Sequence, residues 1–384
     1  MLQSDLNYIK RVFKSYYYAN YQKLVKEVSE YQSREWAFQT FDNLMVRHRS
    51  ITNPDELKRY LEDPPKGVYY SLSLYEDPTA EMQEKGRVST DLVFDLDADH
   101  IYGVMSKKAY VCRKCGYIGS ERICDNCSDD ASPIFIVDDL TIDDVIMELK
   151  RLTDKLENLL GISSEETKIF FSGLRGFHLH VESPPYINID DLGRIELKDL
   201  LTLEGVDFKK VRSPKASIVY MVWRDGKKVL QKVGNKHSIP PLVKKILSTH
   251  DLDELSSLLK SVEVRNDKDE IKTWLRKLVG IHIDPAVLTD LSRLIRAPYS
   301  LHGKSSLIKN PVNMDDLESG GSYVIDKSMV MRGRTEVLIK YMPDLIWAGK
   351  EYHETYNERV ILPESLAIYL VNINLAEDLK PVLF

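Results

Sequence analysis

All four cysteines of the 384-residue chain fall in one short segment, with a spacing that is typical of a metal site. Cys112, Cys115, Cys124 and Cys127 form the pattern C-x2-C-x8-C-x2-C. Two such pairs of thiolates bind zinc tetrahedrally, and four protein ligands leave no open position for a substrate. The sequence therefore predicts a structural zinc site. The alternative is a reduced loop that holds no metal.

Asp95 and Asp97 form a second group with metal-binding chemistry, at the end of a strand-like segment that starts at Asp91. Side chains alternate along a strand, so both carboxylates face one side and the apolar residues between them face the other. Two neighbouring carboxylates repel each other unless a cation bridges them. Oxygen-only ligation suits Mg²⁺ or Mn²⁺. The other interpretation is a solvated strand end, because the D-x-D pattern is often accidental.

The segment SGLRGFH, which begins at Ser172, has the composition of a phosphate-binding turn. Its two glycines allow backbone amides to approach a ligand closely. Arg175 offers a planar fork of donors that matches a phosphate group. His178 lies just past the turn, so the three polar residues together suit a triphosphate. The alternative is a plain hairpin with an exposed arginine.

Asp284 lies directly before Pro285 in the segment HIDPAV. Aspartate is a good N-cap and proline a good first helical residue, so the simplest interpretation is the start of a helix. The pattern predicts that this helix runs to Arg296 and carries Arg293.

The next segment, APYSLHGKS, adds further side chains that suit phosphate. Together with Arg296 they are His302 and Lys304. Gly303 to Ser305 resembles the end of a Walker A loop. The earlier glycine of that motif would fall at Pro298, so this interpretation is excluded.

The elements around these residues predict an α+β protein with mixed or antiparallel sheets flanked by helices. Strands are expected at 44–47, 68–74, 91–97, 168–171 and 177–181, with the last two joined as a hairpin, and helices at 6–28, 55–61, 141–160, 190–203, 239–248, 251–262 and 268–278. A second hairpin is expected at 218–230, because Asp225-Gly226 is a strong turn signal. We expect a catalytic core at 1–186 and 279–384, a zinc-binding insertion at 105–132 and a mainly helical inserted lobe at 187–278.

Composition excludes several classes of protein. Hydrophobic residues make up 43% and charged residues 29%, which is ordinary for a globular protein, and the net charge of −6 excludes a globally basic nucleic-acid coat protein. Residues 207–237 hold nine Lys/Arg and two Asp, or 9 − 2 = +7, which indicates either a nucleic-acid contact or a solvated face. The longest strongly apolar run has six residues, so no membrane span is expected. The start lacks the apolar core of a signal peptide, and we expect an intracellular protein, in the cytoplasm or nucleoid if it is archaeal.

The order of these motifs resembles the catalytic small subunit of archaeal and eukaryotic DNA primase. The resemblance starts with an Arg-Glu-aromatic-x-Phe segment at Arg34 to Phe38 and a strand that ends in Arg47. LVFDLD, the cysteine insertion, SGLRGFH, HIDPAV and APYSLHGK then follow in the same order. It extends from about Tyr8 to about Val312. Each motif is modest by itself, but their order and spacing are specific.

The resemblance implies a role for each matching residue. Asp95, Asp97 and Asp284 would be the catalytic carboxylates, which hold two Mg²⁺ or Mn²⁺ ions. The contacts to the phosphates of the incoming nucleotide would be Ser172, Arg175, His178, Arg296 and His302. Two positions depart from the family pattern: Leu174 replaces an arginine that some members have, and Ala37 replaces a glycine.

The implied activity is the synthesis of short primers on a single-stranded DNA template from nucleoside triphosphates, with release of pyrophosphate. The implied partner is the large subunit of primase, in a heterodimer. Two alternatives stay open at this point: a non-priming repair or translesion polymerase of the same superfamily, and a non-enzymatic zinc-ribbon protein that binds nucleic acid. Template-dependent incorporation without a primer would separate the three.

The zinc prediction can be tested by elemental analysis of protein purified without chelators, which should give about one zinc per chain. Removing the metal should loosen residues 105–132 and lower the melting temperature, because metal binding and local folding are coupled. Iron in place of zinc, or no metal at all, would contradict a structural zinc site.

Overall fold

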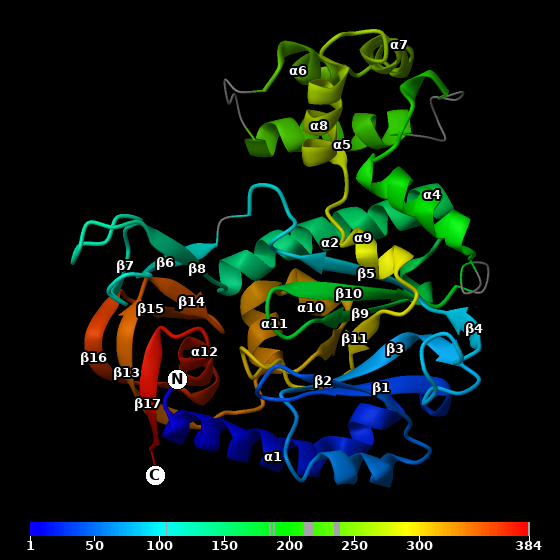
Figure 1. Cartoon of the computed structure of the whole chain (residues 1–384). Helices are drawn as coiled ribbons and strands as arrows, with labels where there is room; N and C mark the ends of the chain where they lie inside the picture. The colour runs from blue at the N-terminus through cyan, green and yellow to red at the C-terminus, as the bar shows by residue number, and fades with distance from the viewer. Residues whose placement is uncertain (105, 184–185, 187–188, 211–217, 234–238, 383–384) are drawn as a thin grey trace.

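The computed structural model describes residues 1–104, 106–183, 186, 189–210, 218–233 and 239–382. They form an α+β fold in which every strand pairing among these residues is antiparallel, as the sequence predicts. Figure 1 shows two central sheets, a helical lobe at the top of the view, and the cysteine segment beside a third sheet at the left.

The first central sheet has the strand order β11-β3-β1-β2, with β4 paired to β3. Its strands are β1 (Arg34–Gln39), β2 (Met45–Arg49), β3 (Gly67–Tyr75), β4 (Arg87–Thr90) and β11 (Leu294–Arg296). Arg34 is buried and forms an ion pair of 2.9 Å with Asp91, the residue directly before the next sheet begins. The first family motif therefore joins the two central sheets.

The second central sheet has the order β12-β9-β10-β5. Its strands are β5 (Leu92–Asp97), β9 (Thr167–Phe171), β10 (Gly176–Val181) and β12 (Asn310–Val312). The helix α2 (Asp139–Leu160) packs on β5 and β10 through the apolar side predicted from its sequence. It starts with a capping box at Asp138 and ends at Gly161 in the left-handed conformation.

The N-terminal helix α1 (Gln3–Lys26) lies below the first sheet in Figure 1. Ile9, Phe13, Tyr17 and Leu24 recur at helical spacing and are fully buried in the main hydrophobic core. Short 3-10 helices accompany the core at Tyr31–Ser33 (η1), Pro54–Tyr60 (η2) and Ser164–Glu166 (η3). The 55–61 helix predicted from the sequence is therefore present, but as a 3-10 helix.

The cysteine segment forms a small sheet that leans on the C-terminal part of the chain. Its order is β7-β6-β8, with β6 at Lys107–Cys112, β7 at Ile118–Gly119 and β8 at Ala131–Ile136. The C-terminal part consists of α10 (Met314–Glu318), α11 (Gly320–Ser328), β13 (Arg334–Met342), β14 (Leu345–Trp347), β15 (Lys350–Tyr352), β16 (Thr355–Pro363), α12 (Glu364–Asn372) and β17 (Ala376–Pro381). Tyr117 of the cysteine segment contacts Tyr356 of β16, with ring centroids 6.1 Å apart.

The lobe has a hydrophobic core of its own, separate from the main one. It is built from η4 (Phe208–Lys210), α5 (Ile218–Val233), α6 (Pro241–Ser248), α7 (Leu252–Val262) and α8 (Lys268–Val279), whereas α4 (Asp191–Thr202) buries Leu197 and Leu201 in the main core. Arg151 and Lys155 of α2 connect it to the main core, because both donate to the carbonyl of Val279. The exact domain boundaries predicted above stay a proposal.

The hairpin predicted at 218–230 is wrong, since this segment forms helix α5. Asp225 and Gly226 make no turn. Asp225 forms ion pairs with Lys155 at 3.0 Å and Arg151 at 3.4 Å. Gly226 lies against α6, where a Cβ atom would come within 2.8 Å of the Leu247 carbonyl oxygen. An ion pair therefore accounts for Asp225, and the close packing of α5 on α6 accounts for Gly226.

The basic window at 207–237 is only partly described. Arg212, Lys215 and Lys236 lie outside the described residues, and of the others the structure describes the side chains of Lys209 and Arg224. Arg224 forms an ion pair of 3.3 Å with Asp154 of α2.

Within the described part of the chain, no helix is both long enough and apolar enough to cross a lipid bilayer.

Gly226→Ala should destabilise the protein, although alanine is the better helix former by roughly 1 kcal/mol. The added methyl overlaps the backbone of α6, and overpacking of this kind costs about 1–3 kcal/mol. Urea unfolding of the full chain measures the effect. Thr273→Ala, on the exposed side of α8, is the control and should leave stability unchanged or slightly raised. A stabilising Gly226→Ala would contradict the close contact of α5 and α6.

Candidate active site

Asp95 and Asp97 lie on β5, directly beside β10, which carries His178. The pairing places His178 opposite Asp95 and Gly176 opposite Asp97. The Nε2 atom of His178 is 3.7 Å from Oδ1 of Asp95. The strand after the glycine-rich turn is therefore the direct neighbour of the strand that carries Asp95 and Asp97.

The turn from Ser172 to Gly176 closes the β9–β10 hairpin, with Ser172 N donating to Gly176 O at 2.8 Å. Gly176 has no room for a side chain, because a Cβ atom would overlap the carbonyl oxygen of Leu96 on β5. Gly173 has a φ of +94°, and a Cβ there would lie 2.9 Å from the Cβ of His302. The two glycines therefore bring the turn close to β5 on one side and to the His302 loop on the other.

Arg175, in this turn, already has two anionic partners. Its Nε lies 2.6 Å from Oδ1 of Asp97 and its Nη1 lies 2.5 Å from Oδ2 of Asp99. The guanidinium is about one-third exposed, so it borders the site rather than being sealed inside it. A phosphate that approaches Arg175 competes with two carboxylates for the same donors.

Asp284 reaches the same place from a different part of the chain. Its backbone N–H donates to the carbonyl oxygen of Asp95 at 2.8 Å. Its side chain caps a short helix, α9 (Pro285–Thr289), by accepting from Ala286 N, and also accepts from Arg293 Nη2 at 2.9 Å. The N-cap prediction is confirmed, and the cap does not exclude a second role.

The predicted extension of this helix to Arg296 is wrong. The helix ends at Thr289, Arg293 lies in the following loop, and Arg296 is part of β11. Pairing of β11 with β3 places Arg296 opposite Tyr69, and its guanidinium lies over the Tyr69 ring, 4.8 Å from the centroid. A strand, not a helix, therefore presents Arg296 to the site.

The loop that carries His302 and Lys304 is held in place by the N-terminal helix. Tyr16 donates to the carbonyl of Tyr299 at 2.8 Å, and the Tyr17 hydroxyl accepts from Leu301 N at 3.2 Å. Tyr299 has a φ of +58°, a strained conformation for a residue other than glycine. The contacts from α1 stabilise that conformation, so α1 contributes to the site without lining it.

These elements enclose a cleft of about 220 Å³. Seven of the sequence-predicted residues line it, together with Lys304, and they are Asp95, Asp97, Ser172, Arg175, His178, Arg296 and His302. Arg293, the partner of Asp284, also lines the cleft, whereas Asp284 lies just behind it. The cleft thus combines carboxylates with arginine, lysine and histidine side chains, and Arg175 and His178 lie directly beside Asp97 and Asp95.

Burial and like charge perturb the carboxylates. Burial, and then the charges of Asp97 and Asp284, raise the pKa of Asp95 to about 7. Burial also raises the pKa of Asp97, although the Arg175 guanidinium opposes this. Burial is the main cause of both shifts, and the neighbouring carboxylates add to the shift of Asp95.

The histidines of the site are neutral at pH 7. Burial lowers the pKa of His178 well below its usual value, and Lys309 adds to this effect. Burial likewise lowers the pKa of His302, whose Nδ1 accepts from the backbone N–H of Lys304 at 3.2 Å. The accepting Nδ1 leaves the proton on Nε2, so His302 is a neutral hydrogen-bond donor.

Sequence reasoning missed three residues that shape the cleft. Tyr69 lines it under Arg296. Lys66 lies beside Gly303, and burial with the charges of Lys304 and Arg296 lowers its pKa. Lys309 is fully buried, donates to the carbonyl of Arg296 at 2.9 Å and faces the ring of Phe170. None of the three has a local sequence signal, because Tyr69 lines the cleft, and Lys66 and Lys309 lie beside its residues, only through strand pairing or loop packing.

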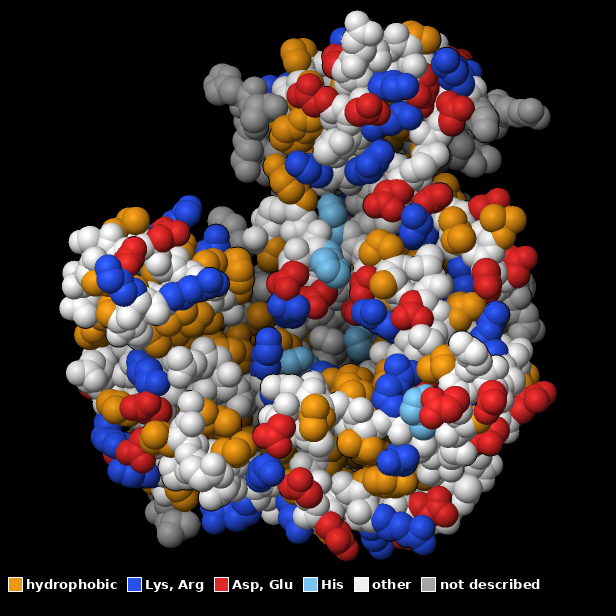
Figure 2. Space-filling view, in the orientation of Figure 1, with side chains coloured by type: hydrophobic (Ala, Val, Ile, Leu, Met, Phe, Trp, Pro, Cys, Tyr) orange, Lys and Arg blue, Asp and Glu red, His pale blue; other side chains and the backbone are white. Residues whose placement is uncertain are grey.

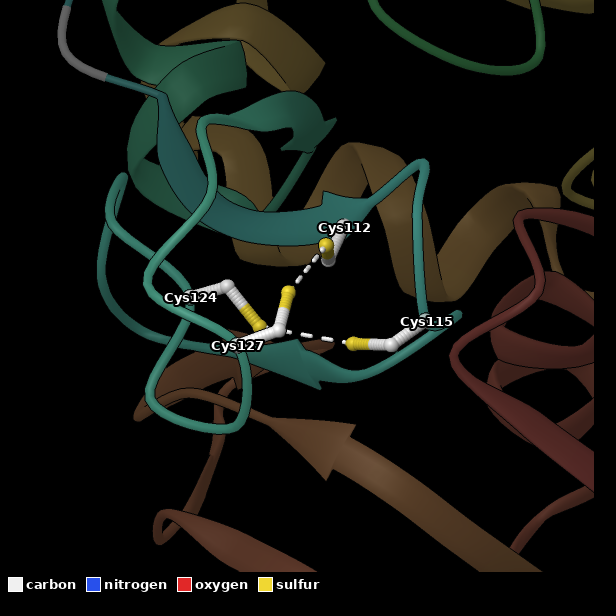
Figure 3. A group of neighbouring side chains, drawn as sticks. All are labelled: Cys112, Cys115, Cys124 and Cys127. Atoms are coloured by element: carbon white, nitrogen blue, oxygen red, sulfur yellow. Dashed lines mark hydrogen bonds between the residues drawn. The ribbon is translucent and has the colours of Figure 1, made fainter.

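The four cysteines converge on one point, as Figure 3 shows. Their sulfur atoms all lie within 4.8 Å of one another, and two pairs, Cys112 with Cys127 and Cys115 with Cys124, are 3.5 Å apart. A tetrahedral site with Zn–S bonds of about 2.3 Å needs sulfur atoms about 3.8 Å apart. Donation from the backbone N–H of Tyr117 lowers the pKa of Cys115 to about 6, which favours a thiolate. The cluster therefore fits a zinc ion.

The three aspartates have the donor atoms that divalent cations prefer, but their side chains are not preassembled into a metal site. Among the described residues, the cysteines are the one group of three or more ligand side chains that converge within 4.8 Å, so the three aspartates do not form a closed cage. Their oxygen donors suit Mg²⁺ or Mn²⁺. Arg175 and Arg293 hold two of the three carboxylates and would share them with the ions.

A cleft that combines buried aspartates with arginine and lysine side chains has the groups that a metal-dependent nucleotidyl-transfer enzyme needs. The family model for the DNA primase small subunit matches residues 128–314. The DNA primase small subunit of Pyrobaculum calidifontis is 33% identical over 326 residues, 84% of each chain. The small subunit of Pyrobaculum arsenaticum is 30% identical, and the match covers 94% of this chain and 96% of that protein. The small subunit of Nitrosopumilus maritimus is 27% identical, and the match covers 98% of this chain and 99% of that protein. This chain belongs to the DNA primase small subunit family.

Among solved structures, the polymerase domain of Mycobacterium tuberculosis ligase D in complex with DNA covers 83% of this chain. The two sequences are 13% identical, and the TM-score is 0.38.

Lys309→Met should change how stability depends on pH. Burial lowers the pKa of Lys309 well below 10.5, so the unfolded chain binds a proton that the folded chain releases, and stability rises with pH up to the unfolded value. The slope attributable to one such group is about 1.4 kcal/mol per pH unit. Melting temperatures between pH 7 and 9 should therefore rise less steeply in Lys309→Met than in the native protein. Parallel curves would show that Lys309 is charged in the fold.

Proposed function

We propose that this chain is the catalytic subunit of a DNA primase, which joins nucleoside triphosphates into short primers on single-stranded DNA. Membership of the primase small subunit family supports template-directed nucleotidyl transfer, and it excludes the non-enzymatic zinc-ribbon alternative. The observation that carries the proposal in detail is that Asp95 and Asp97 line the cleft together with its cations, and that Asp284 is hydrogen-bonded to Asp95 just behind it.

The three aspartates are the proposed ligands for two divalent ions. Asp95 and Asp97 share one face of β5, and a backbone hydrogen bond fixes Asp284 to Asp95. The raised pKa of Asp95 supports this role, because a bound cation would relieve the repulsion that raises it. When bound, such ions activate the attacking hydroxyl and stabilise the leaving pyrophosphate.

The arginine, lysine and histidine side chains of the cleft are the proposed binding site for the triphosphate. Arg175 and Arg296 supply planar forks for phosphate oxygens, and Ser172 lies in the same glycine-rich turn as Arg175. His178 and His302 are neutral, so they donate hydrogen bonds without adding positive charge. Lys304 is exposed at the edge of the cleft, where it can meet the outermost phosphate.

Zinc in the cysteine cluster is proposed to be structural, because all four ligand positions come from the protein. It would fix the small β7-β6-β8 sheet next to the C-terminal sheet. The proposed partners are the single-stranded template, nucleoside triphosphates and a primase large subunit, which relatives of this family support in general terms.

The test of this function is incorporation of labelled nucleotides on single-stranded DNA with no primer added. The full chain, with Mg²⁺ or Mn²⁺, should synthesise short products, and the double variant Asp95→Ala/Asp97→Ala should lose at least about 100-fold of the rate because both metal ligands of β5 are gone. The double variant Asp315→Ala/Glu318→Ala on the exposed side of α10 is the matched control. Activity that requires an existing primer would instead indicate a non-priming polymerase. Near-normal incorporation by Asp95→Ala/Asp97→Ala would contradict the proposed catalytic centre.

Asp284→Asn separates the cap from the metal ligand. Asparagine caps a helix as well as aspartate does, so the melting temperature should hardly change. The lost charge should lower turnover by about 100-fold or more if Asp284 holds a metal ion. Asp290→Asn, at the other end of α9, is the control, since Asp290 also accepts from a nearby backbone N–H but lies outside the cleft. Equal turnover in the two variants would return Asp284 to a purely structural role.

A further inference from the structure

The loop that follows Asp97 presents an exposed tyrosine at the junction of the main core and the lobe. Ala98 N donates to the carbonyl of Arg175 at 3.1 Å, and His100 N donates to Asp97 O at 2.9 Å, so the loop turns tightly at the end of β5. Ile101 is buried, Gly103 has a φ of +86°, and Tyr102 between them is 39% exposed. The loop is thus anchored on both sides while its aromatic ring faces outward.

Helix α8 of the lobe supplies the partners of this ring. Ile271, Leu275 and Leu278 bury one side of the helix in the core of the lobe. Trp274 and Lys277, at a spacing of three, share another side. The rings of Tyr102 and Trp274 meet edge to face, with centroids 6.5 Å apart. The Lys277 ammonium lies over both, at 5.8 Å from the Tyr102 centroid and 5.5 Å from that of Trp274.

The other side of the same loop continues into the cleft. Ala98, Asp99, Ile101 and Val104 line a neighbouring cavity of about 400 Å³ that shares Leu174, Arg175 and Lys304 with the cleft. Phe135 of β8 lines the far side of this cavity, is 50% exposed and has Lys108 5.5 Å from its ring centroid. Figure 2 shows the hollow between the lobe, the cysteine segment and the main body, with apolar side chains along its walls and basic ones at its edge.

We propose that Tyr102, Trp274 and Lys277 form a contact for single-stranded DNA, which leads the template from the lobe toward Asp97. Aromatic rings next to lysine are the usual elements of a sequence-tolerant single-strand site, because every base has a face that stacks and every nucleotide carries a phosphate. Asp99, the acidic residue nearest in the loop, is ion-paired with Arg175, which it shares with Asp97. The proposal rests on the proposed primase function, because it gives the template of that reaction its place.

The test measures the affinity of the full chain for a labelled single-stranded oligo(dT) by fluorescence anisotropy. Tyr102→Ala and Trp274→Ala should each weaken binding by roughly 5- to 150-fold, the range that one base–aromatic stack provides. Trp274→Phe keeps a ring and should restore most of the affinity. Tyr323→Ala, an exposed aromatic residue on α11, is the matched control and should bind like the native protein.

Lys277→Ala tests the salt dependence of DNA binding, which would not change if Lys277 had a purely structural role. Loss of one phosphate contact to a single strand should reduce the slope of log affinity against log salt by about 0.7. At saturating template, the apparent KM for nucleotide should not change in any of these variants, because Tyr102, Trp274 and Lys277 do not line the cleft that holds the proposed triphosphate site.

The contrary result is a lower melting temperature in Tyr102→Ala and Trp274→Ala with unchanged DNA affinity. The cluster would then be only a latch between lobe and core, and the inference would be wrong. Primer synthesis by the native protein is scored separately. If primer synthesis fails while the variants lose DNA binding, the DNA contact is supported and the primase function is contradicted. If primer synthesis succeeds while the variants bind DNA normally, the primase function is supported and the DNA contact is contradicted.

Discussion

Asp95 and Asp97 lie side by side on a buried strand, and a backbone hydrogen bond brings Asp284 to the same place. Bringing three carboxylates together costs free energy, as the raised pKa of Asp95 shows. Arg175 and Arg293 offset part of this cost from the protein side. The part of this free-energy cost that the arginines do not offset favours the binding of cations. Much of the surrounding fold holds the three carboxylates in this arrangement.

Close approach of the elements is what keeps the charges in place. Gly176 lets β10 approach β5, Gly173 lets the turn approach the His302 loop, and Tyr16 and Tyr17 of α1 hold that loop from outside. The two central sheets are joined by the Arg34–Asp91 ion pair. Residues far apart in the sequence therefore act on one cleft, which explains why the matching motifs are spread over most of the chain.

Local chemistry was readable from the sequence, and long-range packing was not. Alternation along a strand placed Asp95 and Asp97 correctly on one face, and the cysteine spacing predicted the cluster that the structure brings together. The Asp225-Gly226 turn signal failed because the partners of both residues, Lys155 and the α6 backbone, lie on other helices. The helix after Asp284 was overextended because β3, which pairs with Arg296, is far away in the sequence. Lys309 was missed for the same reason: its neighbours Arg296 and Phe170 meet it only in the fold.

The central claim is that divalent cations relieve the repulsion among these carboxylates. Its most direct test compares the melting temperatures of the native protein and Asp95→Asn at pH 8, with and without Mn²⁺, while the cysteine site keeps its own metal. Because the pKa of Asp95 is raised from 3.8 to about 7 in the fold, the stability of the metal-free protein falls as the pH rises between these values, and the whole loss is present at pH 8. Without Mn²⁺, Asp95→Asn should therefore melt at a higher temperature than the native protein. Mn²⁺ should stabilise the native protein clearly and the variant much less. An equal response of both proteins to Mn²⁺ would contradict the account.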